Sequence, residues 1–252
     1  MIDGVDAITL LLAFSVVVVG GFIKGATAFG FPLFTTPLMA ALIGPKAAVV
    51  VLVLPVLVSN IIVLLTRRAA PGTARRLVPM LLPLVPATVV GSVLLARADG
   101  TVVAVVVGAV GLAFAALSLR RSALRVRPRA ERWLAPLFGL VSGLLHGASG
   151  ISGPVVVAYI DALGLNPRAF AYSVTVLFTA TGLMQSVTYV GLGLFSPGLL
   201  GLSLLLVPAG LVGQQVGFKV QDRIAPARFR LIVLGLVALA SANLVLRGLG
   251  SL

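Results

Sequence analysis

Three stretches of this chain are apolar over nearly the length of a membrane-spanning helix, and they restrict its fold more than any other feature. Residues 47–65, 77–96 and 102–119 each approach the roughly 20 residues with which a helix crosses a bilayer. The chain of 252 residues is 60% hydrophobic and only 10% charged, whereas a soluble domain carries about 25% charged residues. We therefore predict an all-α polytopic membrane protein.

The net charge of +13 at pH 7 comes almost entirely from arginines in short loops between apolar stretches. There, basic residues set the orientation of a membrane protein, so we expect no nucleic-acid partner. The absence of cysteine excludes disulfides and thiolate metal sites. The first apolar stretch, 7–19, follows Asp3 and Asp6 and precedes no small-residue cleavage site. We interpret it as a membrane segment and not as a signal peptide.

An internal repeat runs through the chain with an offset of 122 residues. The glycine-rich motif at 21–32 aligns without a gap with 143–154, so that Lys24 falls on His146 and Thr27 on Ser149. The same offset pairs Pro45 with Pro167, Val85-Pro86-Ala87 with Val207-Pro208-Ala209, Gly91 with Gly213, and Arg97 with Lys219. A duplicated membrane chain with broken segments at matching positions is typical of a secondary transporter.

Each copy divides into five hydrophobic segments, and we place the N-terminal repeat at 1–121, an Arg-rich linker at 122–132 and the C-terminal repeat at 133–252. The segments are 5–24, 30–43, 46–66, 77–96 and 101–119, then 133–146, 153–165, 168–190, 199–218 and 230–246. The second segment of each copy is too short for an untilted crossing. The first two segments are therefore two short crossings, a re-entrant hairpin or one broken helix.

Loop charges predict that the two copies have opposite orientations. The loop after the third segment is basic in the first copy (Arg67, Arg68, Arg75, Arg76) and uncharged in the second (191–198). The loop after the fourth segment is more basic in the second copy, with Lys219, Arg223, Arg228 and Arg230. By the positive-inside rule the copies are inverted repeats in the cell (inner) membrane. The linker, with Arg120, Arg121 and Arg125, is then cytoplasmic and both termini lie outside. An odd number of crossings per copy favours two crossings or a hairpin.

The two glycine motifs are the predicted substrate site. Proline is best tolerated in the first turn of a helix, so we expect a helix to end near Gly25 or Gly147 and another to begin near Pro32 or Pro154. The N–H groups and dipole of that second helix attract anions. The predicted substrate-binding residues are Lys24, Gly25, Ala26, Thr27, Gly30, His146, Gly147, Ala148, Ser149, Gly150, Ser152 and Gly153.

Lys24 and His146 indicate that the substrate is an anion. A lysine at a helix centre costs roughly 2.5 to 3.5 kcal/mol on insertion, so Lys24 either contacts substrate or snorkels to the interface. His146, the only histidine, contacts the anion, carries a proton or is a neutral ring in a helix interface. Thr27 and Ser149 either donate to the anion or cap helices. Asn60, Gln185 and Gln214 lie within apolar segments, where they line the path or bond between helices.

With these residues and motifs the chain resembles the sulfite exporter family of TauE/SafE type, also called toluene-sulfonate uptake permeases. The resemblance extends from about Ala7 to Leu246 and includes both motifs, although the first carries Ala28 and Phe29 where the family is richer in glycine. It implies transport of sulfite, thiosulfate, a sulfonate or a related organic anion across a bacterial cell membrane.

From these observations we expect a secondary transporter that works by alternating access. Its partners would be a small anion, protons as coupling ion and the lipid bilayer, with a homodimer left open. The alternatives are an anion channel and a membrane scaffold without a substrate. The sequence holds no nucleophile–base pair and no cluster of metal ligands, so we expect no enzyme, catalytic residue, metal or cofactor.

Overall fold

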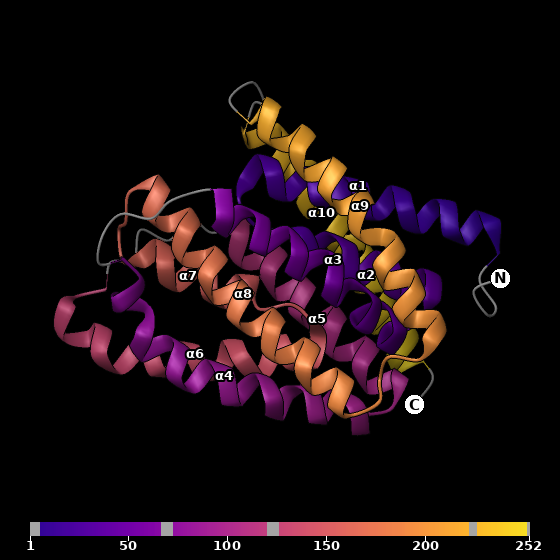
Figure 1. Ribbon diagram of the computed structural model, residues 1–252, viewed down its shortest axis with the longest axis horizontal. Coiled ribbons are helices and arrows are strands. Elements are labelled where there is room, and N and C mark those ends of the chain that lie inside the picture. The colour runs from indigo at the N-terminus through magenta and orange to yellow at the C-terminus, as the bar shows by residue number, and fades with distance from the viewer. Residues whose placement is uncertain (1–5, 67–72, 120–125, 222–225, 251–252) are drawn as a thin grey trace.

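The structure is a computed structural model that describes residues 6–66, 73–119, 126–221 and 226–250, and its regular elements in these ranges are all helices (Figure 1). Five of them (α1, α3, α4, α8 and α9) are long and apolar enough to cross a membrane. The predicted all-α membrane fold is confirmed. Several basic residues used for the loop-charge prediction lie outside the described ranges: Arg67, Arg68, Arg120, Arg121, Arg125 and Arg223.

The helices occur as two sets of five, and the sets match at the predicted offset. The first set is α1 (Ala7–Thr27), α2 (Phe31–Ile43), α3 (Pro45–Thr66), α4 (Thr73–Arg97) and α5 (Gly100–Leu119). The second is α6 (Pro128–Ser149), α7 (Gly153–Ala162), α8 (Pro167–Gly191), α9 (Pro197–Val220) and α10 (Pro226–Leu249). Helix α6 begins within the stretch that we assigned to the linker. Proline at the first helical position favours this start.

Each glycine motif is a sharp turn between two helices. After α1 the chain passes through left-handed conformations at Ala28 (φ 69°) and Gly30 (φ 100°), and after α6 through Gly150 (φ 70°). Left-handed residues end helices because they redirect the backbone. Helices α1 and α6 end at Thr27 and Ser149, two residues later than predicted, and the next helices begin one residue before the motif prolines.

Both turns produce helical hairpins, which excludes the single broken helix among the three arrangements left open by the sequence. The N–H of Val126, just before α6, donates to the carbonyl of Ala162 at the end of α7, at 2.9 Å. The α6–α7 pair therefore enters and leaves at the same end of the protein. Gly20 of α1 packs against Thr35 of α2 in the same way, because a Cβ atom at Gly20 would collide with the Thr35 side chain.

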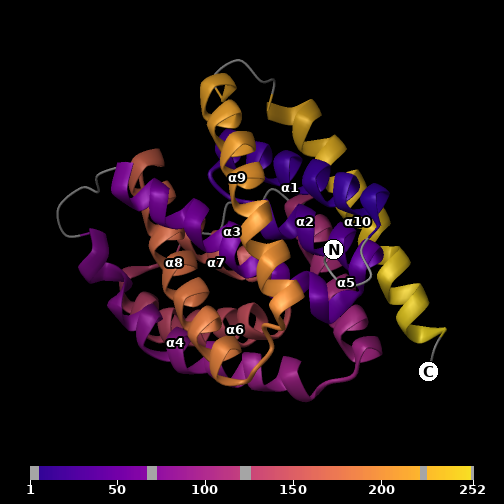
Figure 2. The ribbon, with the colours of Figure 1, turned by 45° about the vertical axis from the view of Figure 1, so that its right-hand side comes forward.

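The two halves interlock through their first and fourth helices. Helix α1 packs along α9, and α6 packs along α4 (Figures 1 and 2). Glycines make both contacts: a Cβ atom at Gly213 would collide with the Val18 carbonyl, and one at Gly143 with the Leu84 carbonyl. Such small residues allow helix backbones to approach closely, as in membrane helix pairs generally.

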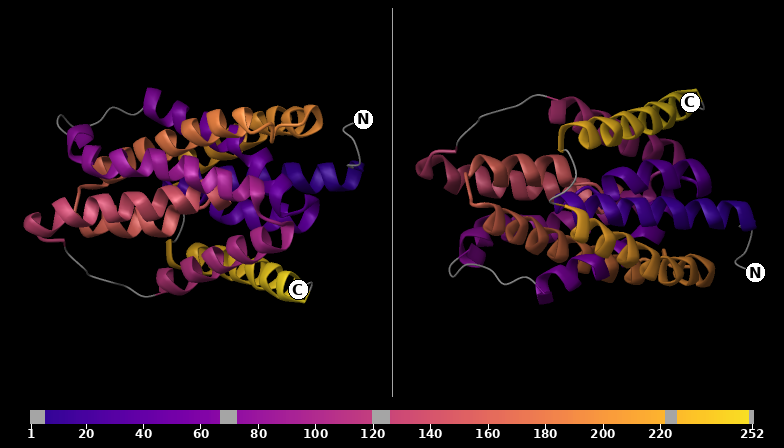
Figure 3. Two further views of the ribbon diagram at one scale, coloured as in Figure 1. Left: turned by 90° about the horizontal axis from the view of Figure 1, so that it is seen from below. Right: turned by 90° about the horizontal axis from the view of Figure 1, so that it is seen from above.

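Equivalent helices of the two halves run in opposite directions. Helices α5 and α10 lie side by side (Figure 3). Gly108 of α5 meets Ser241 of α10, whereas Gly248, further along α10, meets Val105, nearer the start of α5. The residue numbers fall on one helix as they rise on the other, so the pair is antiparallel. This confirms the prediction of inverted repeats.

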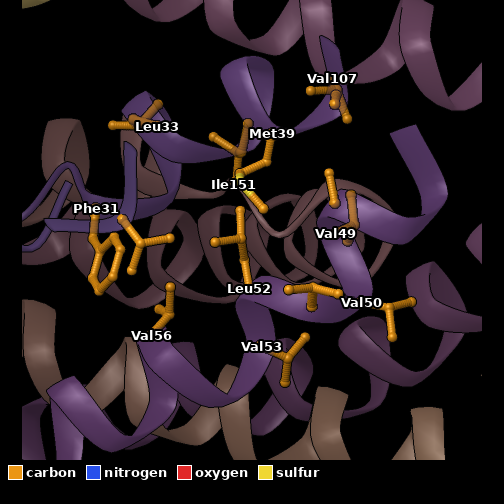
Figure 4. Close-up of a cluster of buried hydrophobic side chains, with 14 of the residues drawn as sticks. Phe31, Leu33, Met39, Val49, Val50, Leu52, Val53, Val56, Val107 and Ile151 are labelled. Carbon is orange, nitrogen blue, oxygen red and sulfur yellow. The ribbon is translucent and has the colours of Figure 1, made fainter. Parts of the chain in front are cut away.

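The tips of the two hairpins meet in the centre of the protein. A Cβ atom at Gly153, the first residue of α7, would lie 2.9 Å from Leu33 in the first turn of α2. Ile151, in the second tip, packs in a buried apolar cluster with Phe31, Leu33 and residues of α3 (Figure 4). The helix N-termini of α2 and α7 therefore face each other across the interface of the halves.

Candidate functional site

The buried amino group of Lys24 is the centre of the first polar cluster. Lys24 lies on the last turns of α1 with only 3% of its surface exposed. Its Nζ donates to Ser59 Oγ at 2.7 Å and to Asn60 Oδ1, both on α3. Ser59 Oγ in turn donates to Gln214 Oε1 on α9, and Gln214 Nε2 donates to the Ser59 carbonyl at 3.3 Å. The cluster thus joins α1, α3 and α9.

This cluster offers donors in excess of acceptors. Among the described residues the one ion pair is Arg76–Glu131, so the partners that surround Lys24 there are neutral. Asn60 is 1% exposed, and within the described part of the chain its Nδ2 is a buried donor with no hydrogen-bond partner. A buried lysine next to an unsatisfied amide donor is costly unless a ligand supplies acceptor atoms. An oxyanion has the acceptor atoms that this group requires.

His146 forms a second cluster in the other half. Its Nδ1 lies 2.9 Å from Ser152 Oγ in the same tip, and its ring stacks on Phe178 of α8 with centroids 6.3 Å apart. The His146 carbonyl accepts a hydrogen bond of 2.8 Å from Gln185 Nε2. Tyr189 donates to the carbonyl of Gly147 at 2.9 Å. Helix α8 therefore holds the end of α6 in place, as α3 holds the end of α1.

A small cavity lies between the halves at the level of the two tips. Pro32 and Thr36 of α2 line it from one side, and His146 and Gly150 line it from the other, together with Gln185 of α8. Apolar residues of α3 complete its wall. The cavity brings the proline of the first motif opposite the histidine of the second. Lys24 lies outside this lining and belongs to its own cluster.

The predicted hydroxyl groups hold the tips. Thr27 Oγ1 donates to the carbonyls of Ile23 and Phe29 at 2.8 and 2.7 Å. Ser149 Oγ donates to the Leu145 carbonyl at 2.7 Å and accepts from the Ile151 N–H at 3.2 Å. These bonds match the capping alternative, in which the hydroxyls satisfy backbone groups freed by the turn.

Four other predicted residues make the contacts between the halves. Gly25 packs against the Gln214 carbonyl and Gly147 against the Thr88 carbonyl. Ala26 and Ala148 follow them and face Gly217 and Gly91. The remaining predicted residues are in the turns: Gly30 and Gly150 supply left-handed backbone, whereas Ser152 and Gly153 begin α7. The predicted residues thus divide into polar clusters, turn residues and packing residues.

The sequence analysis missed three hydroxyl-bearing residues of the polar clusters and the cavity. Ser59, Tyr189 and Thr36 are small or aromatic residues in apolar segments, where such residues commonly pack. Only the neighbour Asn60 marked the position of Ser59 on α3. Ser59 is aligned with Thr181 in the repeat, and both are fully buried.

Two inverted five-helix halves whose helical-hairpin tips meet at the centre define the class of multi-pass membrane transporters. The comparison with known families specifies which one. The chain belongs to the sulfite exporter TauE/SafE family, whose family model matches residues 12–244. No curated protein and no solved structure matches the chain significantly.

Proposed function

We propose that the protein is a secondary transporter that carries a small sulfur oxyanion, sulfite or an organic sulfonate, by alternating access of its inverted halves. The family supports the sulfur chemistry. The single observation that carries the anion assignment is the buried ammonium of Lys24 among neutral partners. An ionised group in such surroundings is stabilised by an opposite charge or by strong acceptors.

In the proposed complex, one oxyanion oxygen accepts from Lys24 Nζ and another from Asn60 Nδ2. Ser59 is held by Gln214, which keeps its oxygen directed at Lys24. The anion then neutralises the cation, and its remaining oxygens face the tips, where the first N–H groups of α2 attract negative charge. We assign the next part of the path to the separate cavity beside His146.

The proposed orientation has both termini outside and the Arg-rich loops in the cytoplasm. The starts of α4 and α6 share one end of the protein, because Arg76 of α4 pairs with Glu131 of α6 at 2.7 Å. Arg75, Arg127, Arg129 and Arg132 belong to the same two helix starts. Basic residues gathered at one end favour the cytoplasmic side for that end.

Thermal-shift measurements on the purified protein test the anion assignment. We expect sulfite or a sulfonate to raise the melting temperature in a saturable way, since a ligand that binds only the folded state stabilises it by mass action. Sodium and potassium chloride at equal ionic strength serve as the control. Stabilisation by cations alone, with no effect of any oxyanion, would contradict the assignment.

We further propose that His146 couples transport to protons, because the residues that line the cavity include its imidazole, a group that can take up and release a proton. Ser152 and Phe178 hold its ring in one orientation. The variant His146→Gln keeps a hydrogen-bonding side chain but takes up no proton. We expect its sulfite flux to lose the pH dependence that the native protein shows. An unchanged pH profile in proteoliposomes would show that the coupling lies elsewhere.

A further inference from the structure

The two interlocking helix pairs are packed in different registers. In the α1–α9 pair, the carbonyls of Val18 and Phe22 face Gly213 and Gly217. In the α4–α6 pair, Gly91, the repeat partner of Gly213, faces the carbonyl of Leu144. Leu144 is the repeat partner of Phe22 and not of Val18. Gly213 of α9 and Gly91 of α4 are equivalent in the two halves. Relative to its partner helix (α1 or α6), this glycine is thus shifted by four residues, about one helical turn, between the two pairs.

The other glycine contacts of the two pairs repeat this shift. Gly25 faces the Gln214 carbonyl, whereas its partner Gly147 faces the carbonyl of Thr88. Gln214 is aligned with Ser92, again four residues beyond Thr88.

An insertion in the sequence does not explain the shift. At the offset of 122, the limits of α4 (Thr73–Arg97) and α9 (Pro197–Val220) agree to within two residues at either end. The aligned Val-Pro-Ala and Gly residues lie within both helices. The two halves therefore contain equivalent helices that pack four residues apart, about one turn or about 6 Å along the axis.

The two registers coincide with different exposure of the hairpin tips. In the first half, Thr27 is exposed and Phe29 and Gly30 are partly exposed. In the second half, Ser149 and Ile151 are fully buried and Ser152 is 1% exposed. The register of the α1–α9 pair thus occurs with an exposed tip, and that of the α4–α6 pair with a buried tip, although the two tips have matching sequences.

Two substitutions between the repeats match the registers. Gly217 makes a close contact in the α1–α9 pair, and its repeat partner is Leu95. Gly139 makes a close contact with the Met80 carbonyl in the α4–α6 pair, and its partner is Val17. If the pairs exchanged registers, Leu95 and Val17 would occupy positions where a Cβ atom meets a carbonyl.

We propose that the two registers are the two alternating states of the transport cycle, and that Val17 and Leu95 are positioning residues which favour the register seen in the structure. This inference rests on the proposed transport function. When the two pairs exchange registers, α1 moves one turn along α9 in the direction of the α1 N-terminus. Helix α6 moves one turn along α4 in the direction of the α6 C-terminus. Lys24 travels with α1, away from Gln214. The anion bound at Lys24 is thereby carried by about one helical turn along α9.

The chain contains no cysteine, so single cysteines introduced at the tips report their accessibility without background. In the native register, Thr27→Cys reacts with a hydrophilic thiol reagent and Ser149→Cys is protected. Combining each with Val17→Gly and Leu95→Gly removes both obstacles to exchange. We expect Thr27→Cys labelling to fall and Ser149→Cys labelling to rise, each by at least threefold. Val19→Gly with Leu82→Gly is the matched control, because it changes the same residue types on the same helices at exposed positions.

Spin-label distances test the sliding movement itself. Leu12 with Val216 reports on the α1–α9 pair and Leu140 with Leu94 on the α4–α6 pair, all four side chains being exposed. On exchange the first distance lengthens and the second shortens, each by up to about 6 Å for four residues of helix. We expect both new distances in the Val17→Gly, Leu95→Gly variant. They should also gain population in the native chain in proteoliposomes during sulfite transport.

The inference would be overturned if the Val17→Gly, Leu95→Gly variant had a native melting profile, unchanged cysteine labelling and only the native spin-label distance in each helix pair. If the variant does not fold, the distances in the native chain during sulfite transport decide the matter in the same way. Sulfite thermal shifts on the same preparations separate the two proposals. Binding without register exchange refutes the sliding movement alone, and exchange without stabilisation by any oxyanion refutes the substrate alone.

Discussion

Replacing Lys24 by methionine is expected to reduce sulfite flux to background while the protein stays folded. The ammonium is the one charge in its cluster, and the side chain of methionine has a similar length without a donor. An anion bound there would lose its charge partner and at least one charge-assisted hydrogen bond, which contribute roughly 1.5 to 3 kcal/mol each. We expect at least a tenfold loss of flux in proteoliposomes that contain equal amounts of protein.

The stability of the same variant separates binding from folding. A buried cation with neutral partners is costly, so its replacement by an apolar side chain leaves the melting temperature unchanged or raises it. Lys46→Met is the matched control: Lys46 is half-buried, and its Nζ donates to the Ala96 carbonyl at 3.0 Å. Lys46→Met should keep its flux. Full transport by Lys24→Met would exclude the cluster from the substrate path.

The position of each helix break was predictable because it depends on local residue chemistry. Glycine and proline act on the backbone of their own turn, and the duplication showed the same turn pattern in both copies. The breaks therefore lie within about two residues of the predicted positions. The loop charges likewise indicated the inverted arrangement that the antiparallel α5–α10 pair now shows.

The partners of each break were not predictable, because they come from helices distant in the sequence. Lys24 and His146 were expected to share one site. Instead Lys24 bonds to Ser59 and Asn60 of α3, and His146 bonds to Ser152 of its own tip. A helical pattern shows which residues share a face but not which helix packs on that face. Lys24, Asn60 and Gln214 were each identified, yet their convergence depends on α9 of the other half.

The difference in register between the α1–α9 and α4–α6 pairs was not predictable from the sequence, for a related reason. The repeat alignment describes each half as if both had one structure. The packing energy of a helix pair depends on which small residue faces which carbonyl, and it changes with each turn of sliding. Gly217 and Gly139 lack glycine partners in the other repeat, but their significance depends on contacts that only the folded chain displays.

Gly213→Val is expected to disrupt the folded protein more than any other single substitution on α9. A Cβ atom there would collide with the Val18 carbonyl, and its next neighbours are backbone atoms of Val18 and Phe22. Backbone cannot rotate away as a side chain can, so the helices must separate. Overpacking of a tight core typically costs about 1 to 3 kcal/mol, and separation also removes neighbouring glycine contacts. We expect a melting temperature lower by at least 10 °C, or loss of monodisperse protein after extraction.

Gly201→Val on the same helix is the control that isolates this contact. A Cβ atom at Gly201 meets nothing within 4 Å, and the residue is exposed, so valine there leaves the packing of the halves intact. Both variants change the helix propensity of α9 in the same way, because each replaces an interior glycine by valine. A difference in melting temperature between them therefore reports the α1–α9 contact. Equal stability would mean that the two helices do not approach closely in the membrane, and the cluster that joins Lys24 to Gln214 would then not form.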